Sequence, residues 1–346
     1  MSNFNPTSAP ELIKDLWSKE VLRSKNILCG INDDDCAIIE LGDKIIGIST
    51  DFLNNRPICL EFEIATFFDL GRLTVASNLS DIIGSGLEPH SFMLGLMVER
   101  SFSEGHFLEY VRGVKYELDK IGIPLIGGDT KLGRDNNYLG IAIGTANSTK
   151  ELIIKNRAKP GDVIFVSGEI GSVAAAISFL NSKFSHDEAF QKLKGWSKDT
   201  LINPSLPIEL SRLLSRLELS LGGTDLSDGL SSDLYDLCKS SGVGAIINAD
   251  LLPINNFAKQ IANLTETEYW KLPFLTGGDF QFIFTVGKED VENILRFPCS
   301  KIGEITDEKS IRIERNNTVN ELKNFGHNDS NNLNFADEVS FHLKML

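Results

Sequence analysis

Residues 70–84 read LGRLTVASNLSDIIG, and this stretch decides the fold because a helical apolar pattern carries polar residues at its edge. The apolar side chains that recur at helical spacing, and so predict a buried stripe, are Val75, Leu79, Ile82 and Ile83. Asn78 and Asp81 lie three positions apart and therefore share one face beside that stripe. A carboxylate buried without a partner is costly, so Asp81 needs one.

Strand-like and helical segments alternate irregularly on both sides of this helix. The first half predicts helices at residues 10–22, 70–84 and 103–121, and strands at 37–40, 44–49, 91–98, 124–126 and 139–146. The second half predicts helices at 172–180, 206–217 and 230–237, and strands at 163–167, 245–248 and 280–286. The irregular order favours a mixed α+β fold over a doubly wound parallel sheet. The turn-rich stretch 147–161 places a domain boundary between residues 1–147 and 148–346.

The composition excludes several classes of function. The 346 residues carry a net charge of −14 and are 42% hydrophobic, which predicts a folded chain with a substantial core. This acidity argues against binding nucleic acid or anionic lipid, because both need clustered Lys and Arg. The five widely spaced cysteines suggest neither a disulfide framework nor a zinc site, and fit a reducing cytoplasm. We find no signal-peptide pattern in residues 1–20 and no apolar run long enough to cross a membrane.

Several aspartates stand in apolar or small-residue contexts, away from charged helix faces. They are Asp33, Asp34 and Asp35, then Asp51, Asp81, Asp129, Asp225 and Asp228. Each alone is typical of a turn or a helix cap, as Asp228 would be before the helix at 230–237. Within the triplet, a shift of one position would change which carboxylate is functional.

Magnesium is an economical partner for several such carboxylates, because Mg²⁺ takes oxygen ligands and bridges Asp side chains to phosphates. The sequence has no GxxxxGKS or GxxxxGKT loop and no protein-kinase set of Lys and HRD residues. A nucleotide triphosphate site in this chain would therefore rely on metal for much of its charge neutralisation. A weaker candidate is the turn at residues 167–171, which could hold an anion at a helix N-terminus but is more typical of plain turn chemistry.

Six motifs in the same order resemble the thiamine-monophosphate kinase family, within the superfamily of aminoimidazole ribonucleotide synthetase and selenophosphate synthetase. The motifs are Asp34-Asp35-Cys36-Ala37, Ser49-Thr50-Asp51, Asn78-Leu79-Ser80-Asp81-Ile82, Gly127-Gly128-Asp129-Thr130, Pro160-Gly161-Asp162 with Val166-Ser167-Gly168, and Asp225-Leu226-Ser227-Asp228-Gly229-Leu230. Each motif is weak alone, and the ordered set is specific. Phe325 and His327 resemble the aromatic-x-His ending of the family.

The resemblance implies a two-domain fold like that of aminoimidazole ribonucleotide synthetase, with a homodimer formed through a β-barrel-like interface of the N-terminal half. Residues 1–147 would be the ATP- and metal-binding and dimerisation domain, and residues 148–346 the C-terminal α/β domain. The family reaction transfers the γ-phosphoryl group of ATP to thiamine monophosphate, with Mg²⁺, and gives thiamine diphosphate and ADP.

The resemblance also implies roles for individual positions. The metal ligands would be Asp35, Ser49 through its backbone oxygen, Thr50, Asp51, Asp81, Asp225 and Asp228. The nucleotide contacts would be Gly128, Asp129 and Ser227, with Lys155 where the family usually has an Arg. We assign the central catalytic positions to Asp81 and Asp228.

The sequence departs from the family pattern where the family contacts its acceptor. Ile58 replaces a substrate-contacting His, and Gly278 replaces a substrate-contacting Glu. Neither side chain can hydrogen-bond a substrate. Arg56 could act as a phosphate clamp, although a solvated loop charge is the commoner role of such a residue. Phe325 completes the candidate substrate positions.

Three hypotheses therefore remain open at this point. The chain is a thiamine-monophosphate kinase, or a superfamily relative that uses ATP and Mg²⁺ on a different small acceptor, or a non-catalytic nucleotide- or metal-binding scaffold. The retained aspartates speak against the scaffold, and Ile58 and Gly278 speak for a different acceptor.

Overall fold

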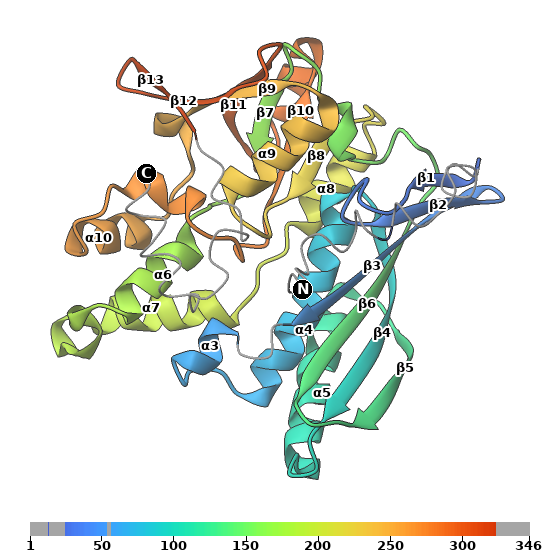
Figure 1. Cartoon of the computed structure of the whole chain (residues 1–346), viewed down its shortest axis with the longest axis vertical. Coiled ribbons are helices and arrows are strands. Elements are labelled where there is room, and N and C mark those ends of the chain that lie inside the picture. Colours follow the sequence, from blue (N-terminus) through green and yellow to red (C-terminus); the bar gives the residue numbers. More distant parts are fainter. Residues whose placement is uncertain (1–12, 14–24, 54–56, 323–346) are drawn as a thin grey trace, which may run out of the picture.

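A computed structural model describes residue 13 and residues 25–53 and 57–322, and it contains two β-sheets with helices packed around them (Figure 1). The expected mixed α+β architecture is confirmed. The expected helix at 10–22 lies almost wholly outside the described residues. Within the described ranges, no helix has both the length and the apolar character needed to cross a bilayer. All five cysteines have free thiols.

The first half of the chain forms a six-stranded sheet in the order β1-β2-β3-β6-β4-β5. Its elements are β1 (Ile27–Cys29), β2 (Ala37–Leu41), β3 (Lys44–Leu53), α3 (Ile58–Glu61), α4 (Phe67–Gly84), β4 (Glu88–Val98), α5 (Glu104–Ile121), β5 (Leu125–Leu132) and β6 (Asn137–Ala146). Neighbouring strands are antiparallel except β4 and β5, which run parallel. Figure 1 shows α4 and α5 on one side of this sheet.

The second half forms a seven-stranded sheet in the order β13-β12-β9-β11-β7-β10-β8. Its strands are β7 (Val163–Val166), β8 (Gly222–Asp225), β9 (Gly244–Asn248), β10 (Phe282–Val286), β11 (Ser300–Thr306), β12 (Ile311–Arg315) and β13 (Thr318–Glu321). Its α-helices are α6 (Ser172–Leu180), α7 (Gln191–Ile202), α8 (Ile208–Ser215), α9 (Leu230–Ser241), α10 (Asn256–Leu264) and α11 (Val291–Ile294). Short 3₁₀ turns are η2 (Lys155–Arg157), η3 (Lys183–His186), η4 (Glu188–Phe190), η5 (Ala249–Leu251), η6 (Tyr269–Phe274) and η7 (Lys288–Asp290). Every residue of β7, β8 and β10 is buried, which places these strands in the core.

Local chemistry explains where the two long helices begin. A capping box between Thr66 and Asp69 starts α4 three residues before the expected position, because each side chain accepts a hydrogen bond from the backbone of the other. Ser103 caps α5 as expected, with its Oγ accepting from the amide of His106 at 3.1 Å. The expected buried stripe of α4 is confirmed, and most of the rest of this helix is buried as well.

Several expected strand limits differ from the structure, and two of them concern candidate site residues. The strand expected to end at residue 126 continues as β5 to Leu132, so Gly128 lies inside a strand. A Cβ at Gly128 would lie 1.9 Å from the carbonyl oxygen of Leu94, which shows how closely β5 approaches β4 there. The strand expected from residue 280 begins two residues later, because Gly278 and Phe280 adopt positive φ angles of 90° and 54°.

Helix α4 joins the two halves of the molecule. It packs against β3 and β6 of the first sheet, against α5, and against β8 and α8 of the second half. The Oγ of Ser211 on α8 donates to the carbonyl of Ile83 at 2.8 Å. A Cβ at Gly84 would lie 2.9 Å from the Cβ of Asp225 and 3.0 Å from its amide nitrogen. A glycine at the end of α4 therefore lets the helix approach β8.

We expect Gly84→Ala to destabilise the fold by about 1–3 kcal/mol, because the added methyl group forces α4 away from β8. Urea unfolding measures this change. The matched control is Gly195→Ala in α7, where a Cβ meets no atom of the described residues within 4 Å. That variant should be neutral or up to about 1 kcal/mol more stable. Equal stability of the two variants would contradict the close contact at Gly84.

Candidate active site

A cavity of about 490 Å³ lies between the two halves of the chain. Its walls come from the end of β3, from α3, α4, β8 and the residues that follow β8, and from the loop before β10. Its oxygen-bearing lining includes Asp35, Thr50, Asp51, Asp81, Asp225, Ser227 and Asp228. These residues span almost two hundred positions of sequence, and the fold brings them to one place.

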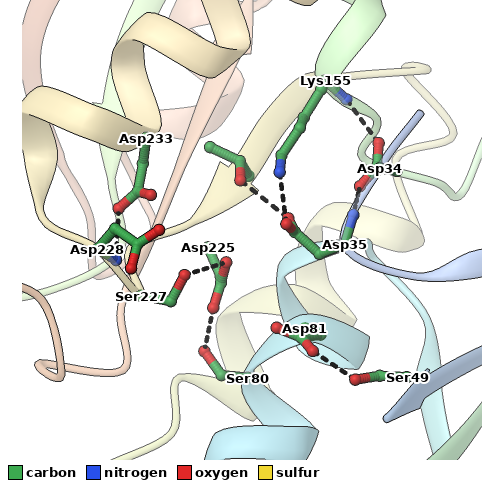
Figure 2. A network of polar contacts seen from close by, with 11 residues as sticks. Asp34, Asp35, Ser49, Ser80, Asp81, Lys155, Asp225, Ser227, Asp228 and Asp233 are labelled. Atoms are coloured by element: carbon green, nitrogen blue, oxygen red, sulfur yellow. Dashed lines mark hydrogen bonds and ion pairs between the residues drawn. The ribbon is translucent and has the colours of Figure 1, made fainter. Parts of the chain in front are cut away.

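In the first half, β3 and α4 fix the carboxylates through buried polar partners. The Oγ of Ser49, which is buried, donates to Oδ2 of Asp81 (Figure 2). The side chain of Asn78 accepts from the amide of Asp51 at 2.8 Å and donates to its carbonyl at 3.2 Å. Asn78 and Asp81 thus share a face of α4, as expected, and each contacts the end of β3.

In the second half, Asp225 ends β8 and is 2% exposed. Its Oδ2 accepts from the Oγ of Ser80 on α4 at 2.9 Å, and its Oδ1 accepts from Ser227 at 3.4 Å. The amide of Asp228 donates to Oδ2 of the buried Asp233 at 3.2 Å. Asp228 is not the cap of α9. The N-cap residue is Gly229, so no side chain caps this helix.

The structure gives Asp34 and Asp35 of the aspartate triplet different partners. Oδ1 and Oδ2 of Asp34 accept from the amides of Asp35 and Lys155, each at 2.9 Å. Asp35 lines the cavity instead, where its Oδ2 accepts from Thr224 at 3.0 Å and its Oδ1 pairs with the ammonium of Lys155 (Figure 2). The geometry therefore favours Asp35 as the member of the triplet that faces a ligand.

Burial and mutual repulsion raise the pKa values of these carboxyls. Burial, with the charge of Asp35 next, raises the pKa of Asp34 to about 7 and that of Asp225 to about 7. Burial and then the charge of Asp225 raise the pKa of Asp81 well above its usual range. The cluster therefore resists full ionisation at neutral pH unless a cation compensates it.

The donor set fits Mg²⁺, because every oxygen donor is a carboxylate or a hydroxyl. Within residues 25–53 and 57–322, no three His, Cys, Asp or Glu side chains already stand in a group that could hold a metal ion. The carboxylates instead bond to serine and threonine hydroxyls and to Lys155. This arrangement suits the way Mg²⁺ usually binds, through one or two carboxylates together with waters and substrate phosphates.

Other expected site residues lie elsewhere. Gly128 and Asp129 are on β5, where Asp129 is exposed and pairs with Lys131 at 2.8 Å. They are not among the residues that line the cavity. Ile58 and Gly278 do line it, as candidate substrate positions. Arg56 and Phe325 lie outside the described residues.

The carboxylate of Asp279 occupies the backbone amides at the end of the turn at 167–171. Both oxygens of Asp279 accept backbone bonds at the start of α6, from Gly171 at 2.6 Å and Val173 at 3.0 Å. Since Asp279 takes these amide donors, the weaker anion-site hypothesis for this turn was wrong.

Sequence reasoning did not single out three residues that bond to the aspartates of the site, namely Ser80, Thr224 and Asp233. Asp233 occupies the first turn of α9, where an acidic residue is typical of an exposed helix start. A signal existed only for Ser80, which lies between Asn78 and Asp81 in the motif on α4.

We expect the stabilisation of the protein by Mg²⁺ to increase with pH. A carboxyl with a raised pKa stabilises the fold below the unfolded value near 4, and this contribution is lost as pH rises through about 7. Mg²⁺ requires the ionised carboxylates, so it compensates that loss. The rise in melting temperature on adding MgCl₂ should be small near pH 5.5 and large near pH 8, with KCl of equal ionic strength as control. A rise that is the same at both values of pH would contradict the buried acidic site.

Comparisons with known proteins match both halves of the chain to one family. The model of the AIR synthase related protein, N-terminal domain, matches residues 33–146, and that of its C-terminal domain matches residues 159–316. The thiamine-monophosphate kinase of Pyrococcus horikoshii is 27% identical over 293 residues, which cover 85% of this chain and 89% of the relative. The enzyme of the same name from Buchnera aphidicola subsp. Schizaphis graminum is 29% identical over 326 residues, 92% and 97% of the two chains.

A solved structure of AaThiL complexed with AMPPCP and TMP superposes with a TM-score of 0.78 at 21% identity, over 94% of this chain and 99% of that one. At this level of identity the likeness concerns the fold. The N-terminal and C-terminal models match in order over most of the sequence, and their residues contain the carboxylates of the cavity. The chain belongs to the AIR synthase related protein family.

Proposed function

We propose that this chain is a thiamine-monophosphate kinase that uses ATP and Mg²⁺. It transfers the γ-phosphoryl group of ATP to a phosphate oxygen of thiamine monophosphate, which breaks the bond to ADP and forms thiamine diphosphate. The curated relatives named above support this activity, as does the ligand pair of the AaThiL structure. The observation that carries the proposal is the cavity in which carboxylates of both halves meet.

Transfer between two phosphates needs alignment and charge neutralisation more than a protein nucleophile. Bound Mg²⁺ would lower the repulsion between the two anions and orient their oxygens. The chain fixes its carboxylates in advance, with Ser49 holding Asp81 and Ser80 holding Asp225. We propose Asp81 and Asp228 as the central pair, because one comes from each half and both line the cavity.

The same cavity has an apolar part suited to the organic body of an acceptor. Its apolar lining includes Leu53, Ile58, Leu73, Leu201 and Leu275. Among the described residues, a Cβ at Gly278 would have no neighbour closer than 3.7 Å, so a glycine in place of the family's Glu leaves room at this wall of the cavity. This room favours a second candidate function, transfer to a different small acceptor by the same ATP and Mg²⁺ machinery.

We further propose a homodimer formed through the first sheet. The face away from α4 carries half-buried or exposed apolar side chains on adjacent strands, among them Ile48, Met97, Ile141 and Ile143. An apolar face of this kind usually marks an interface, and a second copy is the occupant that fits it. β5 is the edge of the same sheet, so its Gly128 and Asp129 would lie near such an interface. The barrel-like form of the interface stays a prediction, and light scattering that gives a monomer mass would exclude the dimer.

The assignment of residues 1–147 and 148–346 as two domains also stays a proposal, supported by one sheet on each side of the boundary. We propose a cytoplasmic location from the five free thiols, because such thiols persist in a reducing compartment.

Purified protein with ATP, Mg²⁺ and thiamine monophosphate should produce thiamine diphosphate and ADP in equal amounts. Asp81→Asn should lower turnover at least roughly 100-fold, because it removes a charge needed for metal and phosphate binding. Asp119→Asn is the matched control, since Asp119 is exposed and pairs with Lys115 on the surface of α5. Chromatographic quantification of both products measures these rates.

ADP release that depends on another phosphorylated acceptor, with no thiamine diphosphate, would overturn the assignment in favour of the second candidate. Normal turnover by Asp81→Asn would overturn the role given to Asp81.

A further inference from the structure

In the described part of the chain, Lys155 is the basic residue that pairs with Asp35, one of the carboxylates that line the cavity. Its ammonium pairs with Oδ1 of Asp35, and its side chain is 14% exposed. The nearby positive charge lowers the pKa values of Asp34, Asp225 and Asp233, against the burial that raises them. Figure 2 shows Lys155 directed toward Asp35 from the chain segment above it.

The backbone of Lys155 is fixed on both sides. Its amide donates to Asp34 at 2.9 Å, and its carbonyl accepts from the Oγ of Ser241 on α9 at 2.6 Å. Only the flexible four-carbon side chain is left to move. A change of partner by the ammonium therefore needs no rearrangement of the surrounding fold.

Asp35 cannot serve two cations equally well. Its Oδ2 accepts from Thr224 at 3.0 Å and its Oδ1 pairs with the ammonium of Lys155, so both oxygens already have a partner. Two cations near one carboxylate repel each other strongly in a part-buried site. A divalent cation that binds Asp35 must therefore compete with the ammonium.

We propose that Lys155 is an exchangeable counter-ion. Its ammonium group neutralises Asp35 until a divalent cation binds there, and then swings away to pair with a phosphate of the nucleotide. Lys155 would thus weaken the binding of a divalent cation in the absence of nucleotide. When nucleotide is bound as well, Lys155 would no longer oppose the cation. By linkage, the nucleotide and the cation then strengthen each other's binding by the same factor. The nucleotide part rests on the proposed function, whereas competition for Asp35 does not.

The test uses Mn²⁺ as the probe and counts free Mn²⁺ by electron paramagnetic resonance. Without nucleotide, Lys155→Met should bind Mn²⁺ at least about fivefold more tightly than the wild type, because the competing charge is gone. Lys155→Arg keeps the charge and should bind like the wild type. Lys159→Met is the control, since Lys159 bonds to Asp162 through its backbone, which the substitution keeps.

A second measurement adds ATP without any acceptor. ATP should raise the Mn²⁺ affinity of the wild type by a larger factor than that of Lys155→Met, because the variant has no ammonium group that could move from Asp35 to ATP. Lys155→Gln serves as a second neutral variant should Lys155→Met fold poorly. Equal or weaker binding of Mn²⁺ by the neutral variants would overturn the proposal. This outcome differs from a failure of the kinase assignment, because no thiamine compound is present.

Discussion

Repulsion between buried carboxylates is the constraint on which the structure of this site depends. Asp35, Asp81 and Asp225 come from distant parts of the sequence and meet at one cavity between the two halves. Hydroxyl groups and one ammonium offset part of that repulsion, and a glycine at the end of α4 allows the close approach that brings Asp225 near. A cavity built in this way is suited to divalent cations and phosphates, which complete its charge balance.

The sequence predicted much of this site because the signals were local. Asp81 stood out as a carboxylate beside an apolar helical stripe, and Asp225 and Asp228 lay in a small-residue motif that also resembled a family. Asp233 gave no signal, since its place in the first turn of α9 is also typical of an exposed residue. Its burial follows from the packing of the helix, which no local pattern records.

Backbone conformation explains where the fold prediction failed. The Gly-Gly-Asp motif at 127–129 was interpreted as a strand end, but Gly128 continues the strand past a close contact with Leu94. The two positive φ angles before β10 delay that strand, and they shape the wall at Gly278. In the proposed function, the carboxylates would form the phosphate side of the cavity, and Ile58 and Gly278 would lie on the acceptor side, which loop geometry shapes.

The central claim is that nucleotide and divalent cation bind this cavity together. Isothermal titration calorimetry of ATP, with Mg²⁺ and with EDTA, tests it most directly and needs no knowledge of the acceptor. The account predicts clear binding with Mg²⁺ and an affinity lower by at least about 100-fold in EDTA, because the carboxylates would otherwise face the phosphates unshielded. Equal affinity under both conditions would contradict it.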